Sequence, residues 1–303
     1  MLRKIAISIG DINGIGLQLA LENHKYIKKI SQPIYCIDKD ILEQGAKKLN
    51  IKIPKDFKIY GQYQSTKIKK GKEKKDSGLF SYQSFLNAIK LAKKRKVDAI
   101  CTLPINKKAW EKAGIKYVGH TDMLRDIFKQ DAIMMLGCSQ MYVALYTEHI
   151  PLKDVPKKIK KYKLTNFLST FYKSINSPDQ KIAVLGLNPH AGDNGVLGDE
   201  EIIINKAIDI VNKKLKKDIF ALVVPDVAFT PHTRKQFKYF VAMYHDQGLA
   251  PLKALHFDQS INVSLNLPII RTSVDHGTAF DIAYKKNSLS NISYINAIKA
   301  AIL

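Results

Sequence analysis

The sequence predicts an α/β protein with a largely parallel or mixed sheet, and three observations support this fold class. Short apolar runs of strand length alternate with amphipathic helical stretches along the chain, which is typical of βαβ units. The chain has 303 residues and 46% apolar content, enough to bury a large core. No internal repeat or long linker divides it. We therefore expect one chain-long unit, residues 1–303, whose subdomain boundaries cannot be read from composition.

The strands are predicted from apolar runs bounded by polar or turn-forming residues. The helices are predicted from apolar positions that recur on one face, as in 82–94, where Phe85, Leu86, Ile89 and Ala92 line up. The segment 200–215 behaves in the same way. In chain order, the predicted strands are 5–9, 33–37, 97–102, 132–137, 141–147, 181–187, 239–245 and 262–267.

The net charge is strongly positive, with 49 Lys and Arg against 27 Asp and Glu, a balance of +22. Such a charge raises the hypothesis of a basic nucleic-acid-binding protein, the alternative from a different functional class. The lysines are spread over predicted helix faces and loops, as in KIKKGKEKKDSG (67–78), with little aromatic interleaving. This pattern favours a solvated lysine-rich surface that attracts small anionic substrates. Nucleic acid is not expected as a partner.

The cysteines and the amino terminus indicate a cytoplasmic protein. Cys36, Cys101 and Cys138 are far apart and odd in number, which favours neither a disulfide framework nor a cysteine zinc site. The first apolar run is too short for a signal peptide and is predicted as a strand. No stretch approaches the ~18 apolar residues of a membrane span, so no membrane partner is expected.

The first glycine-rich loop, GDINGIG (10–16), follows a predicted strand and precedes a helix. Its glycines fit either a tight turn or a close approach of backbone N–H groups to a ligand. The loop lacks the GxGxxG spacing of a dinucleotide fingerprint, and the chain has no GxxxxGK[ST] phosphate loop. The usual nucleotide-binding motifs are therefore absent.

Four histidines follow predicted strands or lie in glycine-bearing loops: His120 in GHTD, His149 in TEHIPL, His190 in NPHAGDNGVLG and His245 in MYHDQG. A single histidine is more often a structural residue than a ligand. The carboxyl ends of strands in an α/β sheet open onto the ligand crevice, so four such side chains favour a site there. Neutral imidazole suits a borderline divalent metal such as zinc. Spacing alone does not show that the four converge.

Four blocks of sequence together resemble one known family. They are TLPINKKAWEKAGIKYVGHTD (102–122), LNPHAGDNGVLGDEE (187–201), AMYHDQGLAPLK (242–253) and INVSLNLPIIRTSVDHGTAFDIA (261–283). These blocks are similar to the 4-hydroxythreonine-4-phosphate dehydrogenases of pyridoxal phosphate biosynthesis, and the resemblance covers nearly the whole chain. It implies an isocitrate/isopropylmalate dehydrogenase-like fold with two α/β subdomains and a cleft between them. It also implies a homodimer with shared active sites, NAD or NADP, and one divalent metal, Zn, Mg or Co.

The resemblance also implies roles for individual residues. A Lys and an Arg suit a phosphate monoester or a carboxylate, and the arginine can engage two oxygens at once. Because Arg271 directly follows the apolar LPII segment, a surface ion pair is a weaker interpretation for it. The family's metal ligands correspond to His149, His190 and His245, and its substrate-binding residues to His120, Thr121, Lys253, Asn262 and Arg271.

The segment GTAFDIA (277–283) resembles the loop that carries adenosine in the wider dehydrogenase fold. An ordinary helix start at Thr278 is the plain structural interpretation. The chain departs from the family's common pattern in three places: GDINGIG stands for GDPAGIG, TLP for TGP, and Tyr284 and Lys285 for a glycine after DIA. The cofactor-binding residues implied by the resemblance are Gly277, Thr278, Ala279 and Asp281.

The implied reaction is metal-assisted oxidation of 4-phosphooxy-L-threonine to a β-keto acid, which decarboxylates to 3-amino-2-oxopropyl phosphate. The sequence leaves the general base open, with Asp246 and Lys253 as catalytic candidates by proximity alone; Asp246 could equally orient a histidine. A sibling dehydrogenase acting on another 4-phosphorylated four-carbon hydroxy acid, of the erythronate or threonate type, would carry nearly the same motifs.

Overall fold

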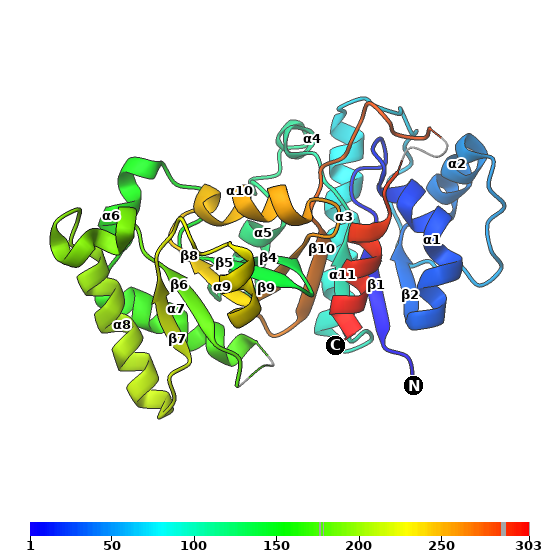
Figure 1. The fold of residues 1–303 in the computed structure, drawn as a ribbon. Coiled ribbons are helices and arrows are strands. Elements are labelled where there is room, and N and C mark those ends of the chain that lie inside the picture. Colours follow the sequence, from blue (N-terminus) through cyan, green and yellow to red (C-terminus); the bar gives the residue numbers. More distant parts are fainter. Residues whose placement is uncertain (176, 178, 286–288, 303) are drawn as a thin grey trace. The chain divides into compact units, whose positions relative to one another are not determined.

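The structure is a computed structural model that describes residues 1–175, 177, 179–285 and 289–302. It contains two compact units, one formed by Met1–Gln130 with Ile261–Leu303 and the other by Asp131–Ser260. Each unit has its own part of a mixed sheet and its own helices (Figure 1). The predicted α/β class is confirmed.

The sheet of the first unit has the strand order β2-β1-β3-β10-β9. Strands β2, β1, β3 and β10 are mutually parallel, and β9 runs antiparallel to β10. The parallel strands are largely buried, as expected for a sheet covered on both faces. Their bounds are β1 Lys4–Ser8, β2 Gln32–Cys36, β3 Ala99–Thr102, β9 Ile261–Leu265 and β10 Ile270–Val274.

Helices cover both faces of this sheet. On one face, Ala6 and Ile100 pack with Phe85 and Trp110, which come from α3 and α4. On the other face, the Thr272 hydroxyl of β10 donates to the carbonyl of Ala297 in α11 at 2.8 Å. The helices of this unit are α1 Gly16–Ile30, α2 Lys39–Leu49, α3 Lys75–Lys93, α4 Lys107–Lys112, α5 His120–Phe128 and α11 Ile292–Ile302.

The sheet of the second unit has the order β4-β5-β8-β6-β7. Strand β4 is antiparallel to β5, whereas β5, β8, β6 and β7 are parallel. Their carboxyl ends therefore lie at one edge of the sheet, where the loops after them can carry a site. The bounds are β4 Ile133–Cys138, β5 Met141–Leu145, β6 Ile182–Leu185, β7 Phe220–Val223 and β8 Tyr239–Ala242.

Helix α10 covers one face of the second sheet, where Leu249 and Leu252 join Val143 and Phe240 in a buried cluster. A Cβ at Gly248 would lie 2.4 Å from Val143 Cγ1, so the glycine permits this close packing. Helices α7 and α8 pack against each other (Figure 1). The bounds are η1 Leu152–Asp154, α6 Val155–Lys158, α7 Lys161–Ser174, η2 Pro189–Gly195, α8 Glu200–Leu215, α9 Pro231–Gln236 and α10 His245–His256.

Each predicted strand overlaps an observed one, and the predicted helix 200–215 coincides with α8. The predicted strand 239–245 is too long, because β8 ends at Ala242 and His245 begins α10. The amide of Met243 donates to the Gln247 side chain at 2.7 Å and not to a neighbouring strand, which ends the ladder on that side of the strand. No helix in the described ranges is both long and apolar enough to cross a bilayer.

Candidate active site

Polar side chains gather on one face of the first sheet, around the buried Arg271 of β10. The strand register pairs Arg271 with Ser264 of β9 and with Ile100 of β3. Residues two apart on a strand face the same way, so Thr102 and Asn262 lie on the same face as Arg271. This pairing explains how residues far apart in the sequence come together.

Arg271 is 2% exposed and makes hydrogen bonds only to neutral groups among the contacts that the described residues supply. Its Nη1 donates to Ser264 Oγ at 3.1 Å and its Nη2 to Thr102 Oγ1 at 2.7 Å. Its Nε has no partner in the described part of the chain. Burial lowers the pKa of Arg271 from 12.5 to about 10, so the group remains cationic at neutral pH. A buried cation without a carboxylate partner is suited to an anionic ligand.

His120 begins α5 and lies beside Arg271. Its ring contacts Phe85 at 4.6 Å and Trp110 at 5.9 Å between centroids, and its buried Nε2 has no partner within the described chain. Burial, and secondarily the charge of Arg271, lowers the pKa of His120 well below 6.5, so its imidazole is neutral. Thr121, 8% exposed, follows in the first turn of α5. The N-terminal amides of α5 add partial positive charge to the same region.

Asn262 and Lys253, the other predicted substrate residues, differ in their surroundings. Asn262 lies in β9, and its buried Oδ1 is without a partner among the described residues. Lys253 belongs to the second unit, where it lies in α10 with its ammonium 5.3 Å from the centre of the Phe257 ring. The structure thus gathers His120, Asn262 and Arg271 around β9, β10 and α5.

The three predicted metal ligands follow three parallel strands of the second unit. His149 lies four residues after β5, His190 five after β6 and His245 three after β8. Gln247 ties two of these strand ends together, because its amide donates to the Gly186 carbonyl at 2.7 Å and accepts from the Met243 amide. All three histidines therefore leave the sheet at the same edge.

His149 and His245 come together within one chain, with ring centroids 5.4 Å apart and planes tilted by 42°. Two imidazoles on one tetrahedral zinc ion would have centroids roughly 5 Å apart, so this pair fits a shared ion. No group of three His, Cys, Asp or Glu side chains close enough to hold a metal occurs among the described residues. His190 is thus not joined to the pair, and a three-ligand set stays a prediction.

His190 lies in a strained loop that a buried carboxylate holds in place. Residues 190–194 all have positive φ, which is uncommon outside glycine and is a feature of functional sites. Glu201 Oε1 accepts hydrogen bonds from the amides of Leu187 and Asn188, both at 2.7 Å. Its Oε2 accepts from Asn188 Nδ2 at 2.9 Å. Sequence reasoning missed Glu201, although it is the last residue of the block 187–201 and the second residue of α8.

The two candidates for the general base occupy different positions on α10. Asp246 follows His245, its side chain is 85% exposed, and its Oδ1 lies 3.4 Å from His245 Nδ1. This contact suits a carboxylate that orients the imidazole. Lys253 lies eight residues further along the helix, a rise of roughly 12 Å from His245. Lys253 is therefore positioned by a helix and not by a loop that follows a strand.

The predicted cofactor residues lie next to the first glycine-rich loop. The carbonyl of Thr278 accepts from the Ile15 amide at 3.1 Å, and a Cβ at Gly14 would lie 2.6 Å from that oxygen. Gly14 is therefore needed for close approach. Gly277 and Asp281 are exposed, and Ala279 has a φ of +43°. Residues 275–285 contain only bends, turns and irregular backbone, so an ordinary helix does not start at Thr278.

Tyr284, which departs from the family's pattern, anchors this segment. Its hydroxyl donates to the Ile12 carbonyl at 2.7 Å, and its amide donates to Gln18 Oε1 at 2.9 Å. Its φ of +60° lies in the left-handed region that favours glycine over other residues. The tyrosine thus holds the segment with the candidate cofactor-binding residues against the first glycine-rich loop.

Asp11 in the first loop is a buried carboxylate that the sequence did not single out. Its Oδ1 accepts from the Asn13 amide at 2.9 Å and its Oδ2 from the Ser77 hydroxyl at 3.1 Å. Burial raises the pKa of Asp11 to about 6 despite these hydrogen bonds. No motif signal marks this residue, since an aspartate in a glycine-rich turn is ordinary.

Comparisons with known proteins agree with the resemblance seen in the sequence. The family model described as pyridoxal phosphate biosynthetic protein PdxA matches residues 29–301. A 4-hydroxythreonine-4-phosphate dehydrogenase of Sulfurimonas denitrificans is 60% identical over 300 residues, covering 99% of this chain and 97% of the relative. That of Campylobacter fetus is 54% identical over 303 residues, covering 99% and 98%.

Solved structures show the same fold. The crystal structure of a 4-hydroxythreonine-4-phosphate dehydrogenase from Burkholderia phymatum is 30% identical, with a TM-score of 0.81 over 99% of this chain and 98% of that one. The enzyme of that name from Klebsiella pneumoniae gives the same identity, TM-score and coverage.

Proposed function

This chain belongs to the family of the pyridoxal phosphate biosynthetic protein PdxA, and from that premise we propose that it oxidises 4-phosphooxy-L-threonine with NAD or NADP. The product would be a β-keto acid that loses carbon dioxide to give 3-amino-2-oxopropyl phosphate. The relatives' shared name, 4-hydroxythreonine-4-phosphate dehydrogenase, supports the substrate.

The observation that carries the proposal is the buried Arg271 with no acidic partner in its described surroundings. A guanidinium in this setting is stabilised by a phosphate or carboxylate, which it can bind through two parallel hydrogen bonds. The amides at the start of α5 favour negative charge as well. Neutral His120 and Asn262 each keep a buried polar atom available for a substrate hydroxyl or oxygen.

The donor set of the second unit fits a divalent metal. The 5.4 Å separation of the His149 and His245 rings suits imidazole ligation of zinc or cobalt better than of magnesium, which prefers oxygen ligands. We infer that His190, from this chain or from a second copy, completes the set. When bound, the ion would supply Lewis-acid polarisation of the substrate's oxygens.

The chain's own residues would carry the remaining steps. Arg271, Lys253 and the α5 amides would hold the anionic groups, while His120, Thr121 and Asn262 orient the carbinol. The hydroxyl proton would pass to a base, for which Asp246 and Lys253 both stay candidates, as hydride leaves the carbinol carbon for the nicotinamide. The C–C bond to the carboxyl group would then break, its electron pair would move toward the ketone to form an enolate, and carbon dioxide would leave. A proton returned to the carbon that carried the carboxyl group would give the amino ketone product.

The segment that carries Gly277, Thr278, Ala279 and Asp281 would hold the nicotinamide cofactor. Open space around Gly277 allows close approach of a ligand to the backbone, and the exposed carboxylate of Asp281 can accept hydrogen bonds from ribose hydroxyls. We also propose a homodimer whose active sites are shared between subunits, as the sequence resemblance implies.

The test is an absorbance assay of NADH or NADPH formation with 4-phosphooxy-L-threonine, 4-phosphoerythronate and 4-phosphothreonate as parallel substrates. It is run with zinc, magnesium or cobalt and again after chelation. We expect turnover of the amino acid substrate and loss of activity on chelation. Reduction of cofactor only with the two hydroxy acids would identify a sibling dehydrogenase instead, and no reduction with any substrate would refute the proposal.

A further inference from the structure

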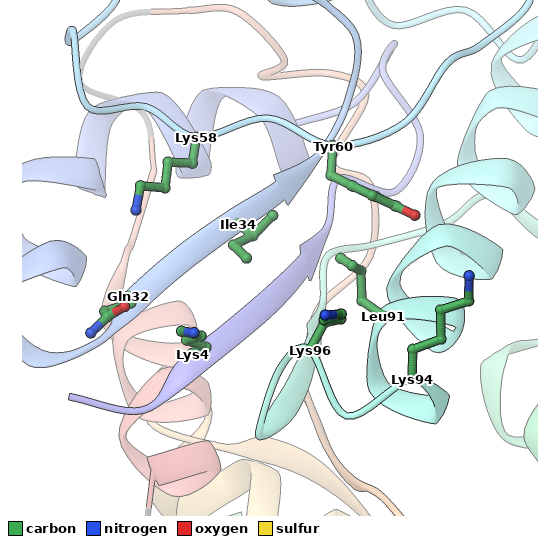
Figure 2. Close-up of a pocket in the computed structure, with 8 residues that line it drawn as sticks. All are labelled: Lys4, Gln32, Ile34, Lys58, Tyr60, Leu91, Lys94 and Lys96. Atoms are coloured by element: carbon green, nitrogen blue, oxygen red, sulfur yellow. The ribbon is translucent and has the colours of Figure 1, made fainter. Parts of the chain in front are cut away.

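A separate pocket of about 460 Å³ lies in the first unit, at the amino ends of β1 and β2. Figure 2 shows Ile34 and Leu91 in its middle, with Lys58 on one side and Lys4 and Lys96 on the other. Its size is within the range of small-molecule sites. The lining residues are Lys4, Gln32, Ile34, Lys58, Tyr60, Leu91, Lys94 and Lys96.

Backbone hydrogen bonds fix the walls of this pocket. The amide of Tyr35 donates to the Lys58 carbonyl at 2.9 Å, and the amide of Tyr60 donates to the Tyr35 carbonyl at 2.8 Å. The segment around Ile59 therefore continues the sheet edge as a short bridge, and Lys58 and Tyr60, two residues apart, face the same side. On the opposite wall, the Asp98 amide donates to the Lys4 carbonyl at 2.8 Å. The pocket is thus largely preformed.

The lysine ammonium groups around the pocket are not paired with carboxylates in the described part of the chain. No carboxylate of the described residues forms an ion pair with the ammonium of Lys4, Lys58, Lys94 or Lys96. The nearby Asp98 carboxylate accepts from the Lys4 backbone amide at 2.7 Å. A lysine at the carboxyl end of α3, such as Lys94, can be explained by the helix dipole. That explanation does not extend to Lys4 and Lys58, which come from a strand and a loop.

We propose that this pocket binds a small phosphate ester carried on a flat, apolar ring. Several ammonium groups around one space suit a phosphate monoester, which carries close to two negative charges, better than a single carboxylate. The ring would lie on Ile34 and Leu91 beside the Tyr60 side chain, which removes apolar surface from water.

This pocket is separate from the Arg271 cluster within the same unit. Lys4 and Gln32 are the first residues of β1 and β2, whereas Thr102, a contact of Arg271, is the last residue of β3. The register places Arg271 level with Ile34 of the pocket, but strands β3 and β1 lie between β10 and β2. The three strand spacings amount to roughly 14 Å. A ligand here would therefore act away from the substrate.

The experiment is calorimetric titration of the full-length protein with phenyl phosphate, and with inorganic phosphate and phenol as the charge-only and ring-only probes. We expect saturable binding of phenyl phosphate that is at least about tenfold tighter than that of either simpler probe. The double variant Lys58→Glu with Lys96→Glu should weaken it by about tenfold or more, and Lys58→Gln with Lys96→Gln by less.

The matched control is Lys25→Glu with Lys52→Glu, which changes the net charge equally at exposed positions outside the pocket. It should leave the affinity unchanged. Titration of the Arg271→Lys protein distinguishes the pocket from the Arg271 cluster, because phenyl phosphate should still bind at the pocket in this variant. The proposal is overturned if phenyl phosphate does not bind, if inorganic phosphate binds equally well, or if the pocket and control variants weaken binding alike. None of these results depends on which substrate the enzyme oxidises.

Discussion

Replacing Arg271 by methionine should destabilise the ligand-free protein only modestly while abolishing turnover. The residue is 2% exposed, and its hydrogen bonds go to the hydroxyls of Ser264 and Thr102 rather than to a carboxylate in the described chain. An arginine that served the fold alone would be paired with an acid, and removing it would strand a buried charge. The stability of the variant therefore separates the two roles.

The magnitude follows from the pKa of the group. Burial lowers the pKa of Arg271 from 12.5 to about 10, and at about 1.4 kcal/mol per unit the buried charge destabilises the folded state by about 3 kcal/mol. Methionine removes that term. It also removes two hydrogen bonds, each worth about 1.5–3 kcal/mol because the donor is charged. The two terms oppose each other, so we expect the free energy of unfolding to fall by less than about 3 kcal/mol.

The assay combines urea unfolding with steady-state kinetics. An anionic substrate should raise the melting temperature of the wild type and not of Arg271→Met, because only the wild type offers the cation. Arg271→Lys keeps the charge and loses the planar fork, so kcat/KM should fall about ten- to a hundredfold. Arg95→Lys, at an exposed position, is the matched control and should leave kcat/KM unchanged.

Two results would refute this reasoning. If Arg271→Met lost more than about 3 kcal/mol without ligand, the arginine would be a structural residue in an ionic network. If Arg271→Lys kept full kcat/KM, the guanidinium would not contact the substrate.

The remaining predictions concern the metal, the dimer, the His190 loop and the first glycine-rich loop. His245→Ala should lose bound metal, measured by elemental analysis, together with nearly all turnover, and retention of both would contradict the assignment. Mixing inactive Arg271→Met protein with inactive His245→Ala protein should restore about a quarter of the wild-type activity if each active site combines residues of two subunits. No recovery despite subunit exchange would place each site within one chain. Glu201→Ala removes the carboxylate that holds the His190 loop and should weaken metal affinity ten- to about a hundredfold in a competition titration, with an unchanged affinity opposing that role. Asp11 has its pKa raised from 3.8 to about 6, so its ionisation lowers stability as pH rises through that window, by about 3 kcal/mol in all. In urea titrations, the free energy of unfolding of the wild type should fall relative to that of Asp11→Asn by roughly half of this amount between pH about 5 and about 8. Parallel pH profiles of the two proteins would contradict the prediction.

Among the strands of the described residues, the sequence analysis missed β7 and β10 and predicted the others. Strand β10 has the sequence IRTSV, and because most of its residues are polar, a search for apolar runs does not detect it. Their burial is possible because each finds a partner, as Thr272 does with the Ala297 carbonyl. Strand β7 has four residues and is mostly half-buried, which makes its signal weak.

The candidate residues could be named from motifs, but their grouping depends on strand order. Arg271 and Thr102 are far apart in the chain and meet only because β10 pairs with β3 in a parallel register. The meeting of His149 and His245 likewise follows from the pairing of β5 with β8. Pairing partners of parallel strands are set by tertiary packing, so a linear pattern does not reveal them. Glu201 was missed for a related reason, since a helix-start acid is ordinary until its partners are known.

Neighbouring positions of β10 show where function overrides the usual burial preference. Ile270 is 40% exposed while Arg271, the next residue, is 2% exposed. Alternation along the strand places them on opposite faces, so a chain optimised for stability alone would carry an apolar residue at position 271. The lowered pKa of Arg271 reflects a free-energy cost that neutral hydroxyl partners do not remove. Such a conflict between residue and environment is expected at functional sites, where a ligand supplies the missing interaction. An anion would supply the interaction that Arg271 lacks, and for this reason we propose that the phosphorylated substrate binds at this face of the sheet.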